Sequence, residues 1–248
     1  MTELVHYGLT EGVATITLDS PHNRNALSRQ LLTELFDAVD RAEEDQDARV
    51  VLIRSAERVF CSGADLSEAA EGGMDEGTLA LVALQRRLVA HDLPIVARLA
   101  GPVRAGGLGI VAASDVVLCS DDVTFAFTES RLALAPAVIS LTVVPRLTSR
   151  AAAETFLTGR TFEAREAASM GLVTRAVPAD ELDVAVIEVC SELKKAHPQG
   201  LRETKALLAR DLLDRIDSRA EEMAALSARL FGSDEAREAM TAFLDRKK

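Results

Sequence analysis

The spacing of hydrophobic and polar residues predicts strands and helices that alternate through the first half of the chain. Residues 13–18 alternate apolar and polar side chains, which is typical of a strand with one covered face. Three short, continuous apolar runs predict strands buried on both faces: 50–53, 94–100 and 116–119. Apolar residues at helical spacing predict helices over 28–42 and about 78–92, and Ser28 is placed to cap the first one. This order predicts a parallel or mixed α/β core.

Helical patterns dominate the chain beyond about residue 147. Leu172–Val177 is the segment there that predicts a further strand. Apolar spacing predicts a helix over 182–193, and the Ala, Glu and Arg content from Ser218 to about Arg246 predicts another. No linker rich in Gly, Ser or Pro separates the halves. We therefore expect one compact domain, with a core over residues 1–190 and a helical region over residues 191–248.

The composition is that of an acidic, aliphatic protein. The 248 residues include 28 Lys and Arg against 39 Asp and Glu, a formal net charge of −11. This charge argues against a nucleic-acid partner, because phosphates attract basic surfaces. Hydrophobic residues make up 48% and charged residues 27%, so intrinsic disorder is not expected. With no Trp and one Tyr, the core is expected to be mostly aliphatic.

Signals for secretion, membrane insertion and metal binding are missing from the sequence. The acidic amino terminus is unlike a secretory signal, and the apolar segments near 105–120 and 132–145 are too interrupted to cross a bilayer. Cys61, Cys119 and Cys190 are an odd, scattered set that fits a reducing compartment. No CxxC or HExxH spacing occurs. We expect a soluble cytoplasmic protein without a metal ion or a membrane partner.

Two loops of small residues follow predicted strands. The first is Phe60–Leu66, and the second is Gly101–Gly109. Small residues let a ligand approach the backbone, so two N–H groups from separate loops can form an oxyanion hole. The alternative is that both loops are purely structural turns. Neither loop has the GxGxxG spacing and no GxxxxGK[ST] occurs, which disfavours a dinucleotide dehydrogenase or a P-loop ATPase.

Three side chains near these loops are candidates for acid–base or nucleophilic chemistry. Glu129 lies in a mostly apolar stretch, where a carboxyl group with a raised pKa is expected, although pairing with Arg131 at a surface turn is equally compatible. Cys61 is predicted to have a packing role, because no motif places an activating His beside it. Asp65 is predicted to cap the turn that follows it.

A set of short motifs follows one fixed order over nearly the whole chain. In sequence they are Arg24-Asn-Ala-Leu27, the loop 60–66, the step from Ala100-Gly101 to Gly106-Gly107, Glu129 seven residues before Pro136, residues 157–167, Gly171-Leu-Val and residues 234–248. Each motif alone is modest evidence, but the ordered set is specific. It resembles the crotonase superfamily, the enoyl-CoA hydratase/isomerase family.

The resemblance implies an α/β fold: a crotonase-like spiral of ββα units followed by a C-terminal helical region used in trimer formation. A homotrimer or a dimer of trimers is expected. The ligand would be an acyl-CoA thioester, with no cofactor other than the coenzyme A of the substrate. By position, Ala64 and Gly106 would supply the two N–H groups of an oxyanion hole. The substrate-binding residues that the resemblance implies are Ser62, Gly63, Ala64, Asp65, Gly106, Phe243 and Lys247.

Glu129 matches one of the two glutamates that hydratases of this superfamily use, and Gly109 stands in place of the other. Three functions follow from this departure. The favoured one is a hydratase that adds water to 2-enoyl-CoA with Glu129 alone. The others are an isomerase with Glu129 as its single acid and base, and an acyl-CoA binder with little activity. Arg104 is expected to neutralise Glu129 or point to solvent, and the Cβ of Ala105 disfavours a positive φ.

Overall fold

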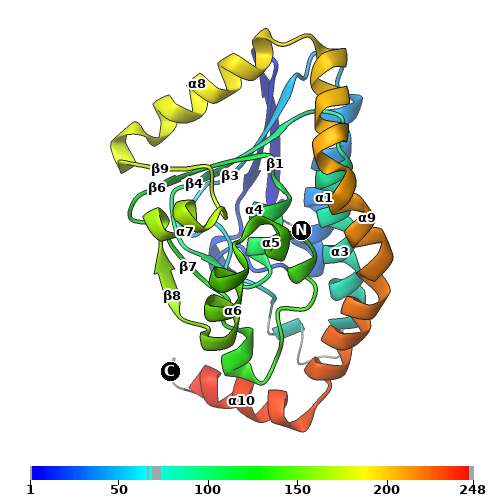
Figure 1. The fold of residues 1–248 in the computed structure, drawn as a ribbon, viewed down its shortest axis with the longest axis vertical. Helices are drawn as coiled ribbons and strands as arrows, with labels where there is room; N and C mark the ends of the chain where they lie inside the picture. The colour runs from blue at the N-terminus through cyan, green and yellow to red at the C-terminus, as the bar shows by residue number, and fades with distance from the viewer. Residues whose placement is uncertain (1, 66, 69–73, 246–248) are drawn as a thin grey trace.

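The computed structural model describes residues 2–65, 67–68 and 74–245, and within them two β-sheets carry the fold (Figure 1). The larger sheet has the strand order β1-β2-β3-β4-β6-β9. Its strands are β1 (Val5–Thr10), β2 (Val13–Leu18), β3 (Val50–Ser55), β4 (Ile95–Leu99), β6 (Val116–Ser120) and β9 (Arg175–Val177). The smaller sheet holds β5 (Val103–Arg104), β7 (Thr124–Ala126) and β8 (Thr161–Glu163). The pair β1–β2 is antiparallel, and every other neighbouring pair of the larger sheet is parallel.

Helices cover both faces of the larger sheet. Figure 1 shows α1 (Arg29–Glu44) and α3 (Met74–Ala90) beside one another, and α8 (Leu182–Lys195) apart from them. The predicted cap of α1 is confirmed, because the Ser28 hydroxyl accepts a hydrogen bond from the Leu31 N–H. The remaining helices are η1 (Pro21–Asn23), α4 (Gly107–Ala113), η2 (Glu129–Leu132), α5 (Ser140–Arg146), α6 (Ser149–Thr158), α7 (Ala164–Met170), η3 (Ala179–Glu181), α9 (Pro198–Phe231) and α10 (Asp234–Asp245). None of the helices in the described part of the chain is long and apolar enough to cross a membrane.

Strand residues alternate between two apolar clusters, as a period of two requires. In β3, Val51 and Ile53 belong to the main core, which includes buried residues of α1, α3 and α4. Val50 of the same strand faces the opposite side, where it packs in a second cluster with Leu182 and Val186 of α8. The continuous apolar run of β3 therefore reflects burial on both faces, as predicted.

Successive strands pass between the two sheets in a spiral. The chain passes through the larger sheet as β4, crosses to the smaller sheet as β5, and then forms helix α4. It then repeats the step with β6 and β7. The prediction of an α/β spiral of ββα units followed by C-terminal helices is confirmed.

Two boundaries of predicted elements differ from the structure. The helix expected from Ser218 to about Arg246 is broken at Gly232, because Ser233 caps a new helix by accepting a hydrogen bond from the Ala236 N–H. The strand expected at Leu172–Val177 begins only at Arg175, since residues 171–174 form the turn that ends α7. The expected division at residue 190 falls inside α8, and α9 starts at Pro198.

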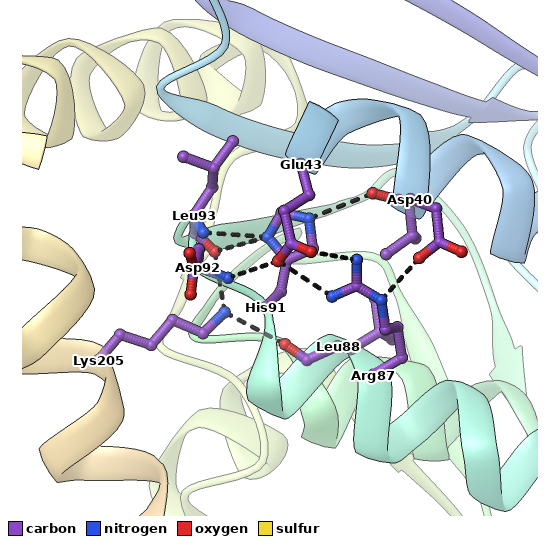
Figure 2. Close-up of polar contacts among 9 residues, drawn as sticks. Asp40, Glu43, Arg87, Leu88, His91, Asp92, Leu93 and Lys205 are labelled. Carbon is purple, nitrogen blue, oxygen red and sulfur yellow. Dashed lines mark hydrogen bonds and ion pairs between the residues drawn. The ribbon is translucent and has the colours of Figure 1, made fainter. Parts of the chain in front are cut away.

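A buried lysine attaches α9 to the core. The Lys205 ammonium donates to the carbonyl oxygens of Leu88 at 3.1 Å and Leu93 at 2.9 Å, as Figure 2 shows. It also lies 2.8 Å from a carboxylate oxygen of Asp115. Burial lowers the pKa of Lys205, and Asp115 opposes this effect. These contacts hold α9 against the end of α3.

A second polar cluster joins α1 to α3 beside this lysine (Figure 2). The Arg87 guanidinium donates to Asp40 at 2.6 Å and to Glu43 at 2.6 Å. His91 is buried in the loop after α3, where its ring nitrogens lie 3.2 Å from the Val39 and Leu93 carbonyl oxygens. Together the two clusters fix the positions of α1, α3 and α9 relative to one another.

Candidate active site

Three loops that follow parallel strands β2, β3 and β4 lie side by side. Leu27 forms a parallel β-bridge with Ala64, and Cys61 forms one with Val103. Parallel strands end at the same edge of a sheet, so the loops after them meet there. These bridges hold the loop 60–65 between the loop containing Leu27 and the loop that leads to Gly106.

The backbone N–H groups of Ala64 and Gly106 come together in this arrangement. A Cβ built on Gly106 would lie 4.0 Å from the Ala64 nitrogen. Among the described residues, neither N–H has a hydrogen-bond acceptor. Gly106 directly precedes α4, where the first N–H groups have no partner within the helix. Two unpaired donors that line one cavity can stabilise an oxyanion.

Close packing requires glycine at two positions of the second loop. A Cβ on Gly106 would lie 2.8 Å from a methyl carbon of Leu27, and one on Gly107 would lie 2.6 Å from the Cβ of Cys61. Cys61 is fully buried, and burial raises the pKa of its thiol to about 12. The thiol is therefore protonated at neutral pH, which agrees with the predicted packing role.

Gly63 and Ala105 adopt left-handed backbone conformations next to the two donors. Gly63 has φ +100°, and a Cβ there would lie 3.0 Å from the Cβ of Ala105. Ala105 itself has φ +44°, contrary to the expectation that its Cβ disfavours a positive φ. Its N–H donates to the Ala126 carbonyl at 3.2 Å, so pairing with the neighbouring strand β7 holds the strained conformation.

Glu129 contributes a carboxyl group to the site. It is the first residue of η2, and its Oε2 atom is buried without a hydrogen-bond partner among the described residues. Burial raises the pKa of this carboxyl to about 7. Pairing with Arg131 does not occur, because the Arg131 guanidinium donates to the Thr158 carbonyl at 2.9 Å. Glu129 can therefore both give and take a proton near neutral pH.

The space beside Gly109 is filled by the side chains of Gln85 and Ile139. A Cβ there would lie 2.9 Å from Oε1 of Gln85 and 3.0 Å from a methyl carbon of Ile139. Gln85 is fully buried and accepts a hydrogen bond from the Thr142 hydroxyl at 2.6 Å. The position at which the resemblance implies another glutamate is thus filled by a buried polar pair from α3 and α5.

A cavity of about 870 Å³ brings the predicted residues together. Its walls are mainly aliphatic. The lining includes Ala26, Leu27, Leu32, Leu81, Leu132, Leu134, Val138 and Ile139. Of the predicted site residues, Ser62, Ala64, Asp65, Gly106, Glu129 and Phe243 line it. Gly63 does not line it and instead supports Ala64, and Lys247 lies outside the described residues.

Asp65 and Arg104 are both occupied by structural contacts. Asp65 accepts hydrogen bonds from Ser67 and Asn23, as expected for a residue that caps a turn. Burial alone would raise the pKa of Asp65, but these hydrogen bonds outweigh burial and lower it. Arg104 neither neutralises Glu129 nor points freely to solvent, because its guanidinium donates to the backbone of Val103 and to Thr124. That contact depends on the pairing of β5 with β7.

Other polar residues of the lining were not identified from the sequence. Arg24 and Arg29 add cations, and Thr78 and Ser227 add hydroxyl groups. Arg24 stands in the first family motif, which is a signal that could have identified it. Thr78 and Ser227 lie within helices and carry no such signal. Phe231, the last residue of α9, and Phe243 of α10 also line the cavity.

The arrangement combines two N–H donors, one carboxyl group with a pKa near neutrality, and an apolar cavity. Within the described ranges, no three His, Cys, Asp or Glu side chains gather where they could hold a metal ion. These groups can stabilise negative charge on a carbonyl oxygen and transfer a proton at an adjacent carbon.

Comparisons with known proteins identify the family of this chain. The sequence model of the family described as enoyl-CoA hydratase/isomerase matches residues 8–248. A Thermus thermophilus protein provisionally named an enoyl-CoA hydratase is 34% identical over 202 residues, 79% of this chain and 80% of that protein. An enoyl-CoA hydratase from Mycobacterium avium, known from its crystal structure, is 42% identical in sequence. The two structures superpose with a TM-score of 0.91 over 99% of this chain and 98% of that chain. A second, from Mycobacterium avium subsp. paratuberculosis, is 30% identical with a TM-score of 0.87, over 98% of this chain and 96% of that one.

Proposed function

Because the chain belongs to the enoyl-CoA hydratase/isomerase family, we propose that it is an enoyl-CoA hydratase. In this reaction water adds across the 2,3 double bond of a 2-enoyl-CoA thioester. The observation that carries the proposal is the buried, unpartnered Oε2 of Glu129 in the same cavity as the free N–H groups of Ala64 and Gly106. The names of the similar proteins support hydration as the reaction.

The two N–H groups act on the thioester oxygen. When the oxygen of water bonds to C3, the electron pair of the double bond moves toward the thioester carbonyl and forms an enolate. Donors at Ala64 and Gly106 stabilise the negative charge on that oxygen more than they stabilise the neutral carbonyl of the substrate. Gly106 can approach the ligand because it has no side chain.

Glu129 handles both proton transfers. As the ionised carboxylate it takes a proton from water while the resulting hydroxide bonds to C3. The carboxyl group, now protonated, delivers that proton to C2, which collapses the enolate and restores the thioester. Water has then been added without a net proton change, and a pKa of about 7 suits both halves of the cycle.

The coenzyme A portion lies toward the surface in this proposal. Ser62 and Asp65 line the cavity on the first loop, and Phe243 lines it on α10. Arg24 is an exposed cation of the lining, which gives the phosphates of coenzyme A a local partner on an otherwise acidic protein. Lys247 remains a proposed second contact.

An isomerase is the second candidate, because Gly109 leaves Glu129 as the only member of the glutamate pair that hydratases of this family use. In that reaction Glu129 would remove a proton from C2 of a 3-enoyl-CoA and return it to C4. One experiment separates the candidates: the enzyme is incubated with 2-enoyl-CoA and with 3-enoyl-CoA, and the products are identified. A 3-hydroxyacyl product from the first supports the proposal, whereas conversion of the second substrate alone supports isomerisation. Binding of both without conversion would leave an acyl-CoA binder.

Assembly as a homotrimer or a dimer of trimers belongs to the same proposal. Leu207 and Leu208 on α9 are large, exposed apolar side chains in this single chain, which supports burial against a partner. Sedimentation equilibrium would give the mass, and a monomer at micromolar concentration would contradict the proposal.

A further inference from the structure

Two buried hydroxyl groups line the cavity on helices α3 and α9. Thr78 of α3 is 5% exposed and Ser227 of α9 is 7% exposed, and both line the cavity. In the part of the chain that the structure describes, no group forms a hydrogen bond with either hydroxyl. The Glu129 mechanism does not use them.

The hydroxyls come from two antiparallel helices that line one cavity. Arg86 of α3 pairs with Asp217 of α9 at 2.6 Å. Lys205, nearer the start of α9, reaches the carbonyl of Leu88 further along α3, so the two helices run in opposite directions. Thr78 lies near the start of α3 and Ser227 near the end of α9, so both stand on the same side of the Arg86–Asp217 pair.

The first turns of α3 are close to the oxyanion hole. Leu81 lies three residues after Thr78, about 4.5 Å along α3. Its Cδ2 atom is 3.3 Å from the Cβ position of Gly106. An acyl chain that extends from a thioester at Gly106 along this wall therefore passes Thr78 after a few carbons, and Ser227 lines the same cavity.

Helical threonines and serines usually bond to the carbonyl one turn earlier. Thr33 does so with Arg29 at 2.9 Å, and Thr155 with Ala151 at 2.7 Å. Thr78 and Ser227 do not, which leaves both hydroxyls available inside the cavity. A saturated hydrocarbon chain at this place would displace water from them and offer no replacement, and an unsatisfied buried hydroxyl is unfavourable.

We propose, building on the acyl-CoA function above, that Thr78 and Ser227 select acyl groups with a neutral hydrogen-bonding oxygen remote from the thioester. The substrate class is then a short acyl-CoA that carries a hydroxyl or keto oxygen at the distal end of its chain. A neutral group is expected because the hydroxyls carry no charge. The cation Arg29, which lines the same cavity, lies 3.4 Å from Glu76.

Binding of saturated, non-reacting esters tests this selection independently of catalysis. Isothermal titration calorimetry on the full chain would compare butanoyl-CoA with 4-hydroxybutanoyl-CoA, and hexanoyl-CoA with 6-hydroxyhexanoyl-CoA. We expect the better-fitting hydroxylated ester to bind at least tenfold more tightly than its matched unsubstituted ester. A tenfold ratio of dissociation constants corresponds to about 1.4 kcal/mol of binding free energy. The Thr78→Val/Ser227→Ala double variant should reduce that ratio below about twofold.

Single variants and a matched control keep the result interpretable. Thr78→Val alone should lose part of the preference, and Thr78→Ser, which retains the hydroxyl, should restore it. Thr33→Val removes a helical hydroxyl outside the cavity and should leave both affinities unchanged.

The possible outcomes separate the two proposals. Equal affinities for matched esters, or a preference that survives in the double variant, would overturn the selection and leave the acyl-CoA function standing. If none of the four esters binds, the acyl-CoA function itself fails, and the selection fails with it.

Discussion

The Glu129→Gln substitution removes a titratable carboxyl group from the cavity and leaves the size of the side chain nearly unchanged. Two opposite effects are expected. Turnover of 2-enoyl-CoA should fall by a factor of about 10²–10⁴, the usual contribution of a general acid–base group. The folded protein should become more stable at alkaline pH, because the amide cannot ionise inside the apolar site.

The stability effect follows from the pKa of Glu129. Burial raises it from 4.5 to about 7 in the folded state. Below pH 4.5 both states carry the proton, so the carboxyl contributes no pH-dependent difference. Between pH 4.5 and 7 only the unfolded chain ionises, and the free energy of unfolding falls as pH rises. Above pH 7 the free energy of unfolding has fallen by its full amount of about 3 kcal/mol. This amount follows because each unit of difference between the folded and unfolded pKa corresponds to about 1.4 kcal/mol.

Thermal unfolding at pH 5 and pH 8.5 measures this difference. The variant and the wild type should melt at similar temperatures at pH 5. At pH 8.5 the variant should melt about 6–12 °C higher, from about 2–4 °C for each kcal/mol in a chain of this size. Glu188→Gln, at an exposed position of α8, is the matched control and should change the melting temperature at neither pH. Equal melting temperatures at pH 8.5 would refute the desolvation of Glu129, and undiminished turnover would refute its catalytic role.

Four further outcomes are expected. In the wild type, kcat/KM should rise with pH through about 7 as Glu129 ionises, and a flat pH profile would contradict its role as the base. Gly106→Ala places a methyl group 2.8 Å from a buried leucine side chain, so kcat/KM should fall about 100-fold in steady-state assays. Ala105→Gly relieves a φ of +44° and should raise the free energy of unfolding in urea by about 1 kcal/mol with activity retained. Lys205→Met leaves Asp115 without its cation and should lower that free energy by about 3–5 kcal/mol, whereas a loss below about 1 kcal/mol would show that the buried pair is unimportant.

The sequence predicted correctly those helices and strands that depend on residues close together in the chain. The apolar run of β3 predicted a strand because it is buried on both faces, and Ser28 predicted the start of α1 because its cap is formed within one turn. The break at Gly232 was missed because the helix-favouring composition on both sides outweighed one glycine followed by a cap residue.

The site was predictable only in part, because its geometry depends on distant pairings. The small loops alone were compatible with ordinary turns, and the resemblance to a family singled out Ala64, Gly106 and Glu129. The role of Arg104 depends on Thr124, which pairing of two very short strands brings near. No local pattern distinguishes Thr78 from any other helical threonine.

The packing around Gly109 makes two distant positions interdependent. A glutamate at residue 109 would collide with Gln85 and disrupt its hydrogen bond with Thr142. Replacing Gln85 first with alanine would instead leave a void in a buried region. Each single step therefore disturbs the buried pair of Gln85 and Thr142, and a smaller residue at position 85 would make room for a carboxylate at position 109. An engineer or a mutating lineage that placed a glutamate at position 109 would therefore have to change position 85 as well, so the two positions are expected to vary together.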